Sequence, residues 1–190
     1  MEVINVDEAQ MRAPHLMKII DEGALFIYPT DTIYGIGCDA TKQDAVDHVR
    51  KLKNRPKMPL SIIVPSKKWI IENCEVTDEA IKYIEELPGP VTLILKLKNK
   101  NAVAKNVIPG LDAIGVRMPK HWITEFVSVY GNPIITTSAN ITGQEFMTDL
   151  DNLDVNLQKG MTFCLFEGEK KGTPSNIIHL EGDKVKVRER

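Results

Sequence analysis

The chain reads ALFIYPTDTIYG from Ala24 to Gly35, and this stretch indicates the kind of fold to expect. Its first five residues are apolar or aromatic, as in a buried strand, and Pro29 ends the run. Small polar side chains, Thr30, Asp31 and Thr32, follow at once. Ligands bind at strand ends in open α/β sheets, so the stretch predicts a buried strand that delivers polar groups to a binding site.

Helical and strand patterns alternate along the rest of the chain. Apolar spacing and capping residues predict helices at about 14–23, 44–53, 77–87 and 121–130, with Thr77 as a helix cap. Apolar runs predict further strands at 60–64, 91–97, 113–117, 133–137, 161–166, 176–180 and 184–188, the last two as a hairpin. Gly35-Ile36-Gly37 is expected to lie in a loop. Together these elements predict an α/β fold with a mixed parallel/antiparallel sheet, in a single domain over residues 1–190.

The composition excludes several classes of protein. In 190 residues, 43% hydrophobic and 26% charged side chains are typical of a globular protein with its own core. The net charge of −2 gives no overall field that would attract nucleic acid, so any RNA contact needs a local patch. The four histidines do not cluster, so no metal site is expected. Three dispersed cysteines, no signal-like start and no membrane-length apolar run predict a cytoplasmic protein without contact to a membrane.

Two further polar features accompany the expected strand ends. A second hydroxyl-rich segment, Thr136–Gly143, follows the strand at 133–137. Lys53 and Arg55 stand at the end of a helix, and Arg117 ends a strand. Turn chemistry explains the hydroxyls equally well, and the cations could complement a helix dipole, worth about 0.3–1 kcal/mol, or form a salt bridge. A phosphate or carboxylate clamp is the functional alternative, because Arg offers a planar fork and Lys a point charge.

Five short motifs occur in an order that resembles the YrdC family, the threonylcarbamoyl-AMP synthases. They are PTDTIYGIGCDA at 29–40, KNRP at 53–56, PGPVT at 88–92, GVRMP at 115–119 and TSANITG at 137–143. Each motif is short, but five in the right order over nearly the full chain make chance a poor explanation. The resemblance implies the YrdC-like fold, a twisted mixed sheet with helices around a central cavity, in its short single-domain form.

The resemblance also implies a reaction. Such enzymes are nucleotidyltransferases that combine L-threonine, bicarbonate and ATP, with Mg²⁺, and release pyrophosphate and threonylcarbamoyl-AMP. A tRNA-modifying transferase complex then moves the threonylcarbamoyl group to the tRNA adenosine beside the anticodon, and a weak contact with tRNA or RNA is a further expectation. Chemistry of this kind rests on positioning and electrostatics and requires no Ser-His or Cys-His pair.

Residue roles follow from the same resemblance. It implies catalytic cations at Lys53 and Arg55, threonine contacts at Thr32, Arg117, Ser138 and Ser175, and nucleotide contacts at Arg55, Ala113, Asn140, Thr148 and Arg188. Two departures from the family pattern stand out. The segment 55–60 is one residue shorter than the usual spacing, and Asn176 and His179 replace the usual Thr and Asp.

Two other interpretations stay open. The first is an RNA-binding module with the YrdC-like fold and no adenylating activity of its own, against which the near-neutral charge and the 6% aromatic residues argue. The second is a different carbamoyl-adenylate chemistry, because related domains occur inside hydrogenase-maturation proteins. Those are much longer chains that also carry zinc-finger and acylphosphatase segments.

Overall fold

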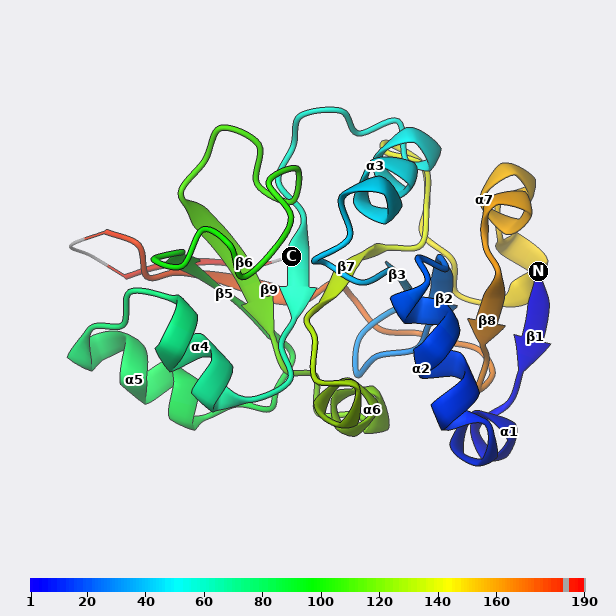
Figure 1. The fold of residues 1–190 in the computed structure, drawn as a ribbon, viewed down its shortest axis with the longest axis horizontal. Coiled ribbons are helices and arrows are strands. Elements are labelled where there is room, and N and C mark those ends of the chain that lie inside the picture. Colours follow the sequence, from blue (N-terminus) through cyan, green and yellow to red (C-terminus); the bar gives the residue numbers. More distant parts are fainter. Residues whose placement is uncertain (183–184, 190) are drawn as a thin grey trace.

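The computed structural model describes residues 1–182 and 185–189, and within them ten short strands form one mixed sheet (Figure 1). In chain order the strands are β1 Glu2–Ile4, β2 Phe26–Tyr28, β3 Gly35–Gly37, β4 Ser61–Ile63, β5 Val91–Lys96, β6 Ala113–Arg117, β7 Ile134–Ser138, β8 Phe163–Leu165, β9 Asn176–His179 and β10 Lys186–Arg188. The α-helices are α1 Val6–Met11, α2 Ala13–Asp21, α3 Gln43–Leu52, α4 Lys67–Asn73, α5 Asp78–Glu85, α6 Trp122–Tyr130 and α7 Val155–Gly160.

The sheet combines parallel and antiparallel neighbours in the order β1-β8-β2-β3-β7-β4-β6-β5-β9-β10. The parallel pairs are β1–β8, β8–β2, β4–β6 and β5–β9, and the other neighbouring pairs are antiparallel. This arrangement confirms the mixed α/β fold expected from the sequence. The expected hairpin is also present as the antiparallel pair β9–β10, although residues 183–184 of its connection lie outside the described residues.

Side-chain caps fix the ends of two predicted helices. The Thr77 side chain accepts a hydrogen bond from the backbone N–H of Ala80 and so begins α5, as the sequence predicts. The His121 ring does the same at α6, with a bond from the N–H of Ile123. Helix α6 ends at Gly131, whose φ of 85° lies in the left-handed region that glycine adopts easily. His121 and Gly131 therefore determine where α6 starts and ends.

The prediction of a loop at Gly35-Ile36-Gly37 is wrong, because these residues form β3 between β2 and β7. A Cβ at Gly37 would lie 2.7 Å from Cε1 of Tyr28, so a side chain there would collide with that ring. The sequence patterns also miss β1, α1, α4 and α7. These elements have 3, 6, 7 and 6 residues, too few to show a clear hydrophobic period.

The sheet buries apolar side chains on both faces. Ile63 and Ile134 belong to one cluster with residues of α1, α2 and α6, whereas Ile62 and Ile135 belong to a second cluster with residues of α3, α4, α5 and α7. The alternation follows from the two-residue period of a strand. Helices therefore cover both faces of the sheet, and the face that carries Ile134 also carries the candidate site.

Among the described residues, we find no helix with the length and hydrophobicity that a membrane span requires.

Candidate active site

A polar pocket of about 140 Å³ opens on the sheet, and its walls come from strands and loops. Hydroxyl side chains from three strands and two loops line it: Thr30, Ser61, Thr92, Thr136, Ser138 and Ser175. Thr137, Tyr34 and the two cations Arg55 and Arg117 also belong to the polar lining. A pocket with this set of hydroxyls and guanidinium groups suits a small polar ligand that carries a negative charge.

The hollow exists because small residues meet on one face of the sheet. Ser61 of β4 pairs with Gly115 of β6 on one side and with Thr136 of β7 on the other. A Cβ at Gly115 would lie 2.4 Å from Oγ of Ser61 and 3.1 Å from Cγ2 of Thr92, so only glycine lets these two lining side chains pack this close to β6. Along β7 the same face changes from Ile134 to Thr136, which turns a core surface into a binding surface.

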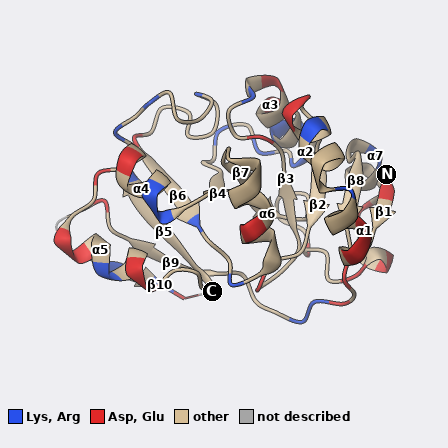
Figure 2. Ribbon diagram, turned by 60° about the horizontal axis from the view of Figure 1, so that its bottom comes forward, with Lys and Arg blue, Asp and Glu red and all other residues tan. Residues whose placement is uncertain are grey.

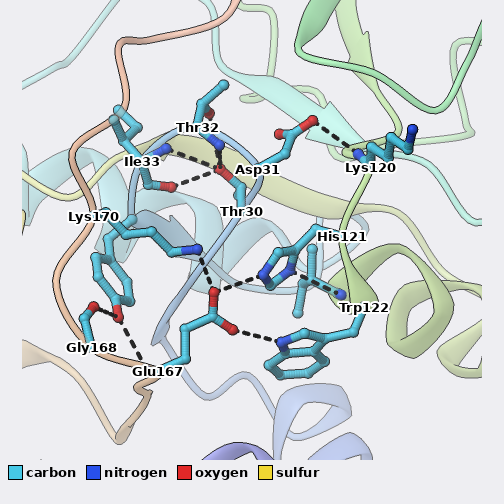
Figure 3. Close-up of polar contacts among 12 residues, drawn as sticks. Thr30, Asp31, Thr32, Ile33, Lys120, His121, Trp122, Glu167, Gly168 and Lys170 are labelled. Atoms are coloured by element: carbon cyan, nitrogen blue, oxygen red, sulfur yellow. Dashed lines mark hydrogen bonds and ion pairs between the residues drawn. The ribbon is translucent and has the colours of Figure 1, made fainter.

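The turn after β2 is held by the hydroxyl of Thr30. Its Oγ1 accepts hydrogen bonds from the backbone N–H groups of Thr32 and Ile33, at 3.1 and 3.2 Å, and donates to the carbonyl of Ile33 at 2.7 Å (Figure 3). The Oγ1 atoms of Thr30 and Thr32 are 2.9 Å apart. The turn chemistry expected as the alternative to a functional role is therefore present. It fixes Thr32 next to the lining residues Thr30 and Ile33, although Thr32 itself does not line the pocket and its threonine contact stays a prediction.

Arg117 reaches this turn from the end of β6. Its Nη2 donates to Oδ1 of Asp31 at 3.0 Å and to Oγ1 of Thr32 at 3.3 Å. The Arg117 and Asp31 side chains are only 7% and 11% exposed, so the ion pair is shielded from water. Asp31 Oδ2 also accepts the backbone N–H of Lys120 (Figure 3). A fixed guanidinium in the pocket wall is well placed to bind a carboxylate.

Lys53 lies behind the pocket and is not among its lining residues. Its side chain is buried, and Nζ donates to the carbonyls of Ser138 and Asn140, at 2.5 and 2.6 Å, and to Oδ1 of Asn140 at 3.1 Å. Burial, with Arg55 as the second cause, lowers the pKa of the Lys53 amine to about 7. Lys53 thus connects the end of α3 to the turn that follows β7.

That turn is held further by its own side chains. Ser138 Oγ donates to Oδ1 of Asn140 at 2.5 Å, and Asn140 Nδ2 donates to the carbonyl of Gln144 at 2.7 Å. Ser138 lines the pocket, whereas Asn140 supports it from behind. The predicted threonine contact of Ser138 and nucleotide contact of Asn140 stay predictions.

Arg55 points to the opposite side of the same segment and lines the pocket. Its Nη2 donates to the carbonyl of Pro59 at 2.7 Å, and its Nη1 lies 3.4 Å from Oγ1 of Thr137. Asn54 between the two cations adopts a φ of 50°, a left-handed turn that separates their directions. The two cations of one motif therefore occupy different environments, one in the pocket wall and one in its support.

A buried arginine that no sequence pattern singled out holds the Arg55 loop. Arg50 Nη1 donates to the carbonyls of Arg55 and Met58, at 2.9 and 3.0 Å. Its Nε and Nη2 donate to the carbonyls of Asn106 and Val107, at 2.6 and 3.1 Å. One guanidinium thus fastens the segment 55–60 to the loop before β6.

Of the four remaining predicted residues, one lines the pocket, whereas Arg188, Ala113 and Thr148 do not. Ser175 lines the pocket, with its Oγ 2.8 Å from Oγ1 of Thr92. Arg188 pairs in β10 with Ile177, which is a lining residue, so both side chains share one face. Ala113 lies at the start of β6, and Thr148 Oγ1 accepts from Nδ2 of Asn152 at 2.7 Å. Neither of these two belongs to the lining, and their nucleotide roles stay predictions.

The sequence interpretation missed several lining residues. It left out Thr30, Ser61, Thr92, Thr136 and Thr137 as ligand contacts. Three of these, Thr30, Thr92 and Thr137, lie inside motifs that the sequence did identify, at 29–40, 88–92 and 137–143, so the motif positions contained the signal. Ser61 could not be found in this way, because its role depends on its register with Gly115, which is 54 residues away along the chain.

Comparison with known proteins agrees with this geometry. Residues 18–190 match the sequence profile of the Sua5–YciO–YrdC family, described as "Telomere recombination". A Methanocaldococcus jannaschii protein, provisionally named a threonylcarbamoyl-AMP synthase, is 38% identical over 187 residues, or 96% of this chain and 86% of that protein. The Vibrio campbellii threonylcarbamoyl-AMP synthase is 29% identical over 85% of this chain and 90% of its own.

A solved structure gives the same result at the level of the fold. Pyrococcus abyssi Sua5 complexed with L-threonine superposes with a TM-score of 0.87 and 28% identity, over 98% of this chain. This chain spans 56% of the length of that Sua5 chain. The motif order, the YrdC-like fold and the profile match over residues 18–190 lead to one conclusion: the chain belongs to the Sua5–YciO–YrdC family.

Proposed function

We propose that this chain is a threonylcarbamoyl-AMP synthase, which combines L-threonine, bicarbonate and ATP and releases pyrophosphate. The observation that carries the proposal is the hydroxyl-lined pocket with Arg117 in its wall. A neighbour of nearly the same fold is described as complexed with L-threonine, and curated relatives carry the name of this enzyme.

The main attraction between the pocket and threonine would be between opposite charges. Arg117 would hold the carboxylate, while the hydroxyls of Thr32, Ser138 and Ser175 orient the amino acid for carbamate formation. Arg55 also lines the pocket and would attract phosphate oxygens of the nucleotide. The described residues that line the pocket include neither Cys nor His, so the proposed mechanism uses positioning and charge stabilisation, with no covalent enzyme intermediate.

Mg²⁺ enters this proposal as the counter-ion of ATP. No group of three or more His, Cys, Asp or Glu side chains among the described residues could hold a metal ion. The donor set therefore does not fit a resident metal held by protein alone, and no step of the proposed reaction depends on one. A magnesium ion that binds mainly to substrate phosphates and water needs no such protein cage.

The product sets the requirements for the next step. Threonylcarbamoyl-AMP is a mixed anhydride, so an acyl transfer to a nucleophile must consume it. We propose the tRNA adenosine beside the anticodon as the acceptor and a tRNA-modifying transferase complex as the catalyst. The proposed location is the cytoplasm, where threonine, ATP and tRNA occur together.

The RNA-binding alternative has weaker support from the charge distribution. Basic and acidic stretches are interspersed over the ribbon, in keeping with a net charge of −2 (Figure 2). An RNA-binding module without adenylating activity would bind RNA at physiological salt in the absence of ATP. A salt titration of tRNA binding would separate the two proposals.

The direct test is an assay of pyrophosphate release from ATP. We expect release that requires both threonine and bicarbonate, and threonylcarbamoyl-AMP as the second product. Pyrophosphate release that ignores threonine would contradict the assignment. A preference for valine of about tenfold would do so too, because about 1.4 kcal/mol is the size of one group contact and would show that the pocket does not recognise the threonine hydroxyl.

A further inference from the structure

The segment 166–175, which we call the strap, connects β8 to β9 and runs beside the pocket. Its last residues, Pro174 and Ser175, line the pocket. The strap forms neither helix nor strand, so no regular ladder of backbone hydrogen bonds sets its position. Its backbone is bonded at two points, where the N–H groups of Phe166 and Lys170 donate to the carbonyls of Ile4 and Thr148, and Ser175 directly precedes β9. Side-chain contacts add further anchors along the strap.

The strongest of these contacts gather on the carboxylate of Glu167. Its Oε1 lies 2.9 Å from Nε2 of His121 and also pairs with Nζ of Lys170, and its Oε2 accepts from Nε1 of Trp122 at 2.8 Å (Figure 3). The Glu167 side chain is 19% exposed. Burial works to raise the pKa of this carboxyl, but the hydrogen bonds from Lys170, Trp122 and His121 lower it on balance. The carboxylate thus connects the strap to the first turn of α6.

The same end of the strap touches the pocket wall through Tyr34, which is itself a lining residue. The Tyr34 hydroxyl accepts the backbone N–H of Glu167 at 3.1 Å and donates to the carbonyl of Gly168 at 2.6 Å. The ring of Tyr34 stacks on Phe166, with centroids 5.8 Å apart. A displacement of Glu167 would therefore move a side chain of the pocket as well as the strap.

The other end of the strap lies against the turn that holds Thr32. A Cβ at Gly172 would be 2.1 Å from the carbonyl oxygen of Thr32, so the two backbones touch and only glycine fits. The strap thus closes on the turn that Arg117 also contacts. The position of the strap therefore determines how tightly this side of the pocket is covered.

We propose that Glu167 is a positioning residue: its carboxylate fixes the strap against α6 so that Pro174 and Ser175 close the pocket over the bound amino acid. The identity of that amino acid, L-threonine, rests on the proposed function. A residue that only stabilised the fold would change the unfolding temperature with no selective effect on threonine. A positioning residue changes the KM for threonine more than kcat.

The experiment compares Glu167→Gln with Glu169→Gln. Glu169 lies on the same strap, is 54% exposed and pairs with exposed Lys171, so it is a matched control. Two readouts are taken: KM and kcat for threonine in pyrophosphate release, and the rate of trypsin cleavage after Lys170 or Lys171. Lys170→Met, which removes one partner of the carboxylate, serves as a milder second variant if Glu167→Gln fails to fold.

We expect Glu167→Gln to raise the KM for threonine about tenfold, which corresponds to about 1.4 kcal/mol, with a smaller change in kcat. Trypsin should cut its strap faster, and threonine should protect the wild type. Glu169→Gln should match the wild type in both readouts. Lys170→Met has lost one of the two trypsin sites, so it should show a raised KM for threonine and faster cleavage after Lys171 alone.

Equal trypsin rates for wild type and Glu167→Gln would overturn the proposal, as would faster cleavage with an unchanged KM. If the wild type shows no threonine-dependent turnover, the proposed function fails instead. In that case the trypsin rates alone test whether Glu167 positions the strap. Faster cleavage of Glu167→Gln than of the wild type supports this role, and an equal rate excludes it.

Discussion

At the scale of single residues, the two cations of the KNRP motif have different surroundings although only one residue separates them. Lys53 is 1% exposed and bonded to the turn after β7, whereas Arg55 is partly exposed and lines the pocket. The KNRP motif alone suggests that both cations act together as one phosphate or carboxylate clamp. The structure separates a supporting amine from a guanidinium that can meet a ligand, and each makes its own prediction.

The first prediction concerns the pH dependence of folding stability. Lys53 has a pKa of about 7 when folded, against an ordinary value of 10.5. Between these values the unfolded chain binds more protons than the folded one, so stability rises as the pH rises through this window. Relative to Lys53→Met, the wild type should gain free energy of unfolding between pH 7 and pH 10.5. Urea unfolding of both proteins at several pH values measures the difference, and parallel curves would show that the buried amine stays charged.

The second prediction separates catalysis from stability. Arg55→Ala should lower kcat/KM about 10- to 150-fold, because charge-assisted hydrogen bonds are worth about 1.5–3 kcal/mol. Its melting temperature should change little, since the side chain is partly exposed. Lys57→Ala, an exposed lysine in the same loop, is the control and should retain normal kinetics. Near wild-type turnover of Arg55→Ala at all substrate concentrations would remove Arg55 from the site.

At the scale of elements, the pocket depends on the register of three strands. The third prediction tests the close packing at Gly115, where a Cβ would collide with the lining residue Ser61. Overpacking of this kind costs about 1–3 kcal/mol, so Gly115→Ala should lose some stability and most of its threonine binding. Gly89→Ala is the control, because a Cβ at Gly89 meets nothing within 4 Å. Calorimetric titration measures the affinity of both variants for threonine. An unchanged affinity in Gly115→Ala would mean that threonine binds elsewhere.

The sequence predicts the elements whose signal is local, such as the buried run of β2 and the Thr77 cap of α5. It fails at β3, because two of its three residues are glycines with no strand preference, and the strand forms through its pairing with β2 and β7. The same division applies to the site. Arg117 and Ser138 could be found from short motifs, whereas Ser61 and the support from Arg50 depend on contacts between distant segments.

At the scale of the whole molecule, binding and folding are linked. The fourth prediction is that L-threonine raises the melting temperature, because a ligand that binds only the folded state stabilises it by mass action. At a concentration 100 times Kd the gain is about 2.7 kcal/mol, or roughly 5–10 °C for a chain of this size. Thermal unfolding with L-threonine and with D-threonine measures the effect. Equal shifts with both enantiomers would mean that the stabilisation is not due to a stereospecific pocket.

The order of strands also determines when the protein can fold as the ribosome makes it. Strands β1 and β2 are made early, yet their common neighbour β8 lies much later in the chain, at Phe163–Leu165. In the same way, β5 is made before its parallel partner β9. At about 5–20 residues per second, roughly 7–27 s pass between the synthesis of β2 and that of β8. During this time the nascent chain exposes unpaired strand edges, which chaperones can bind. The core and the pocket are therefore completed only when β8 and β9 have been made.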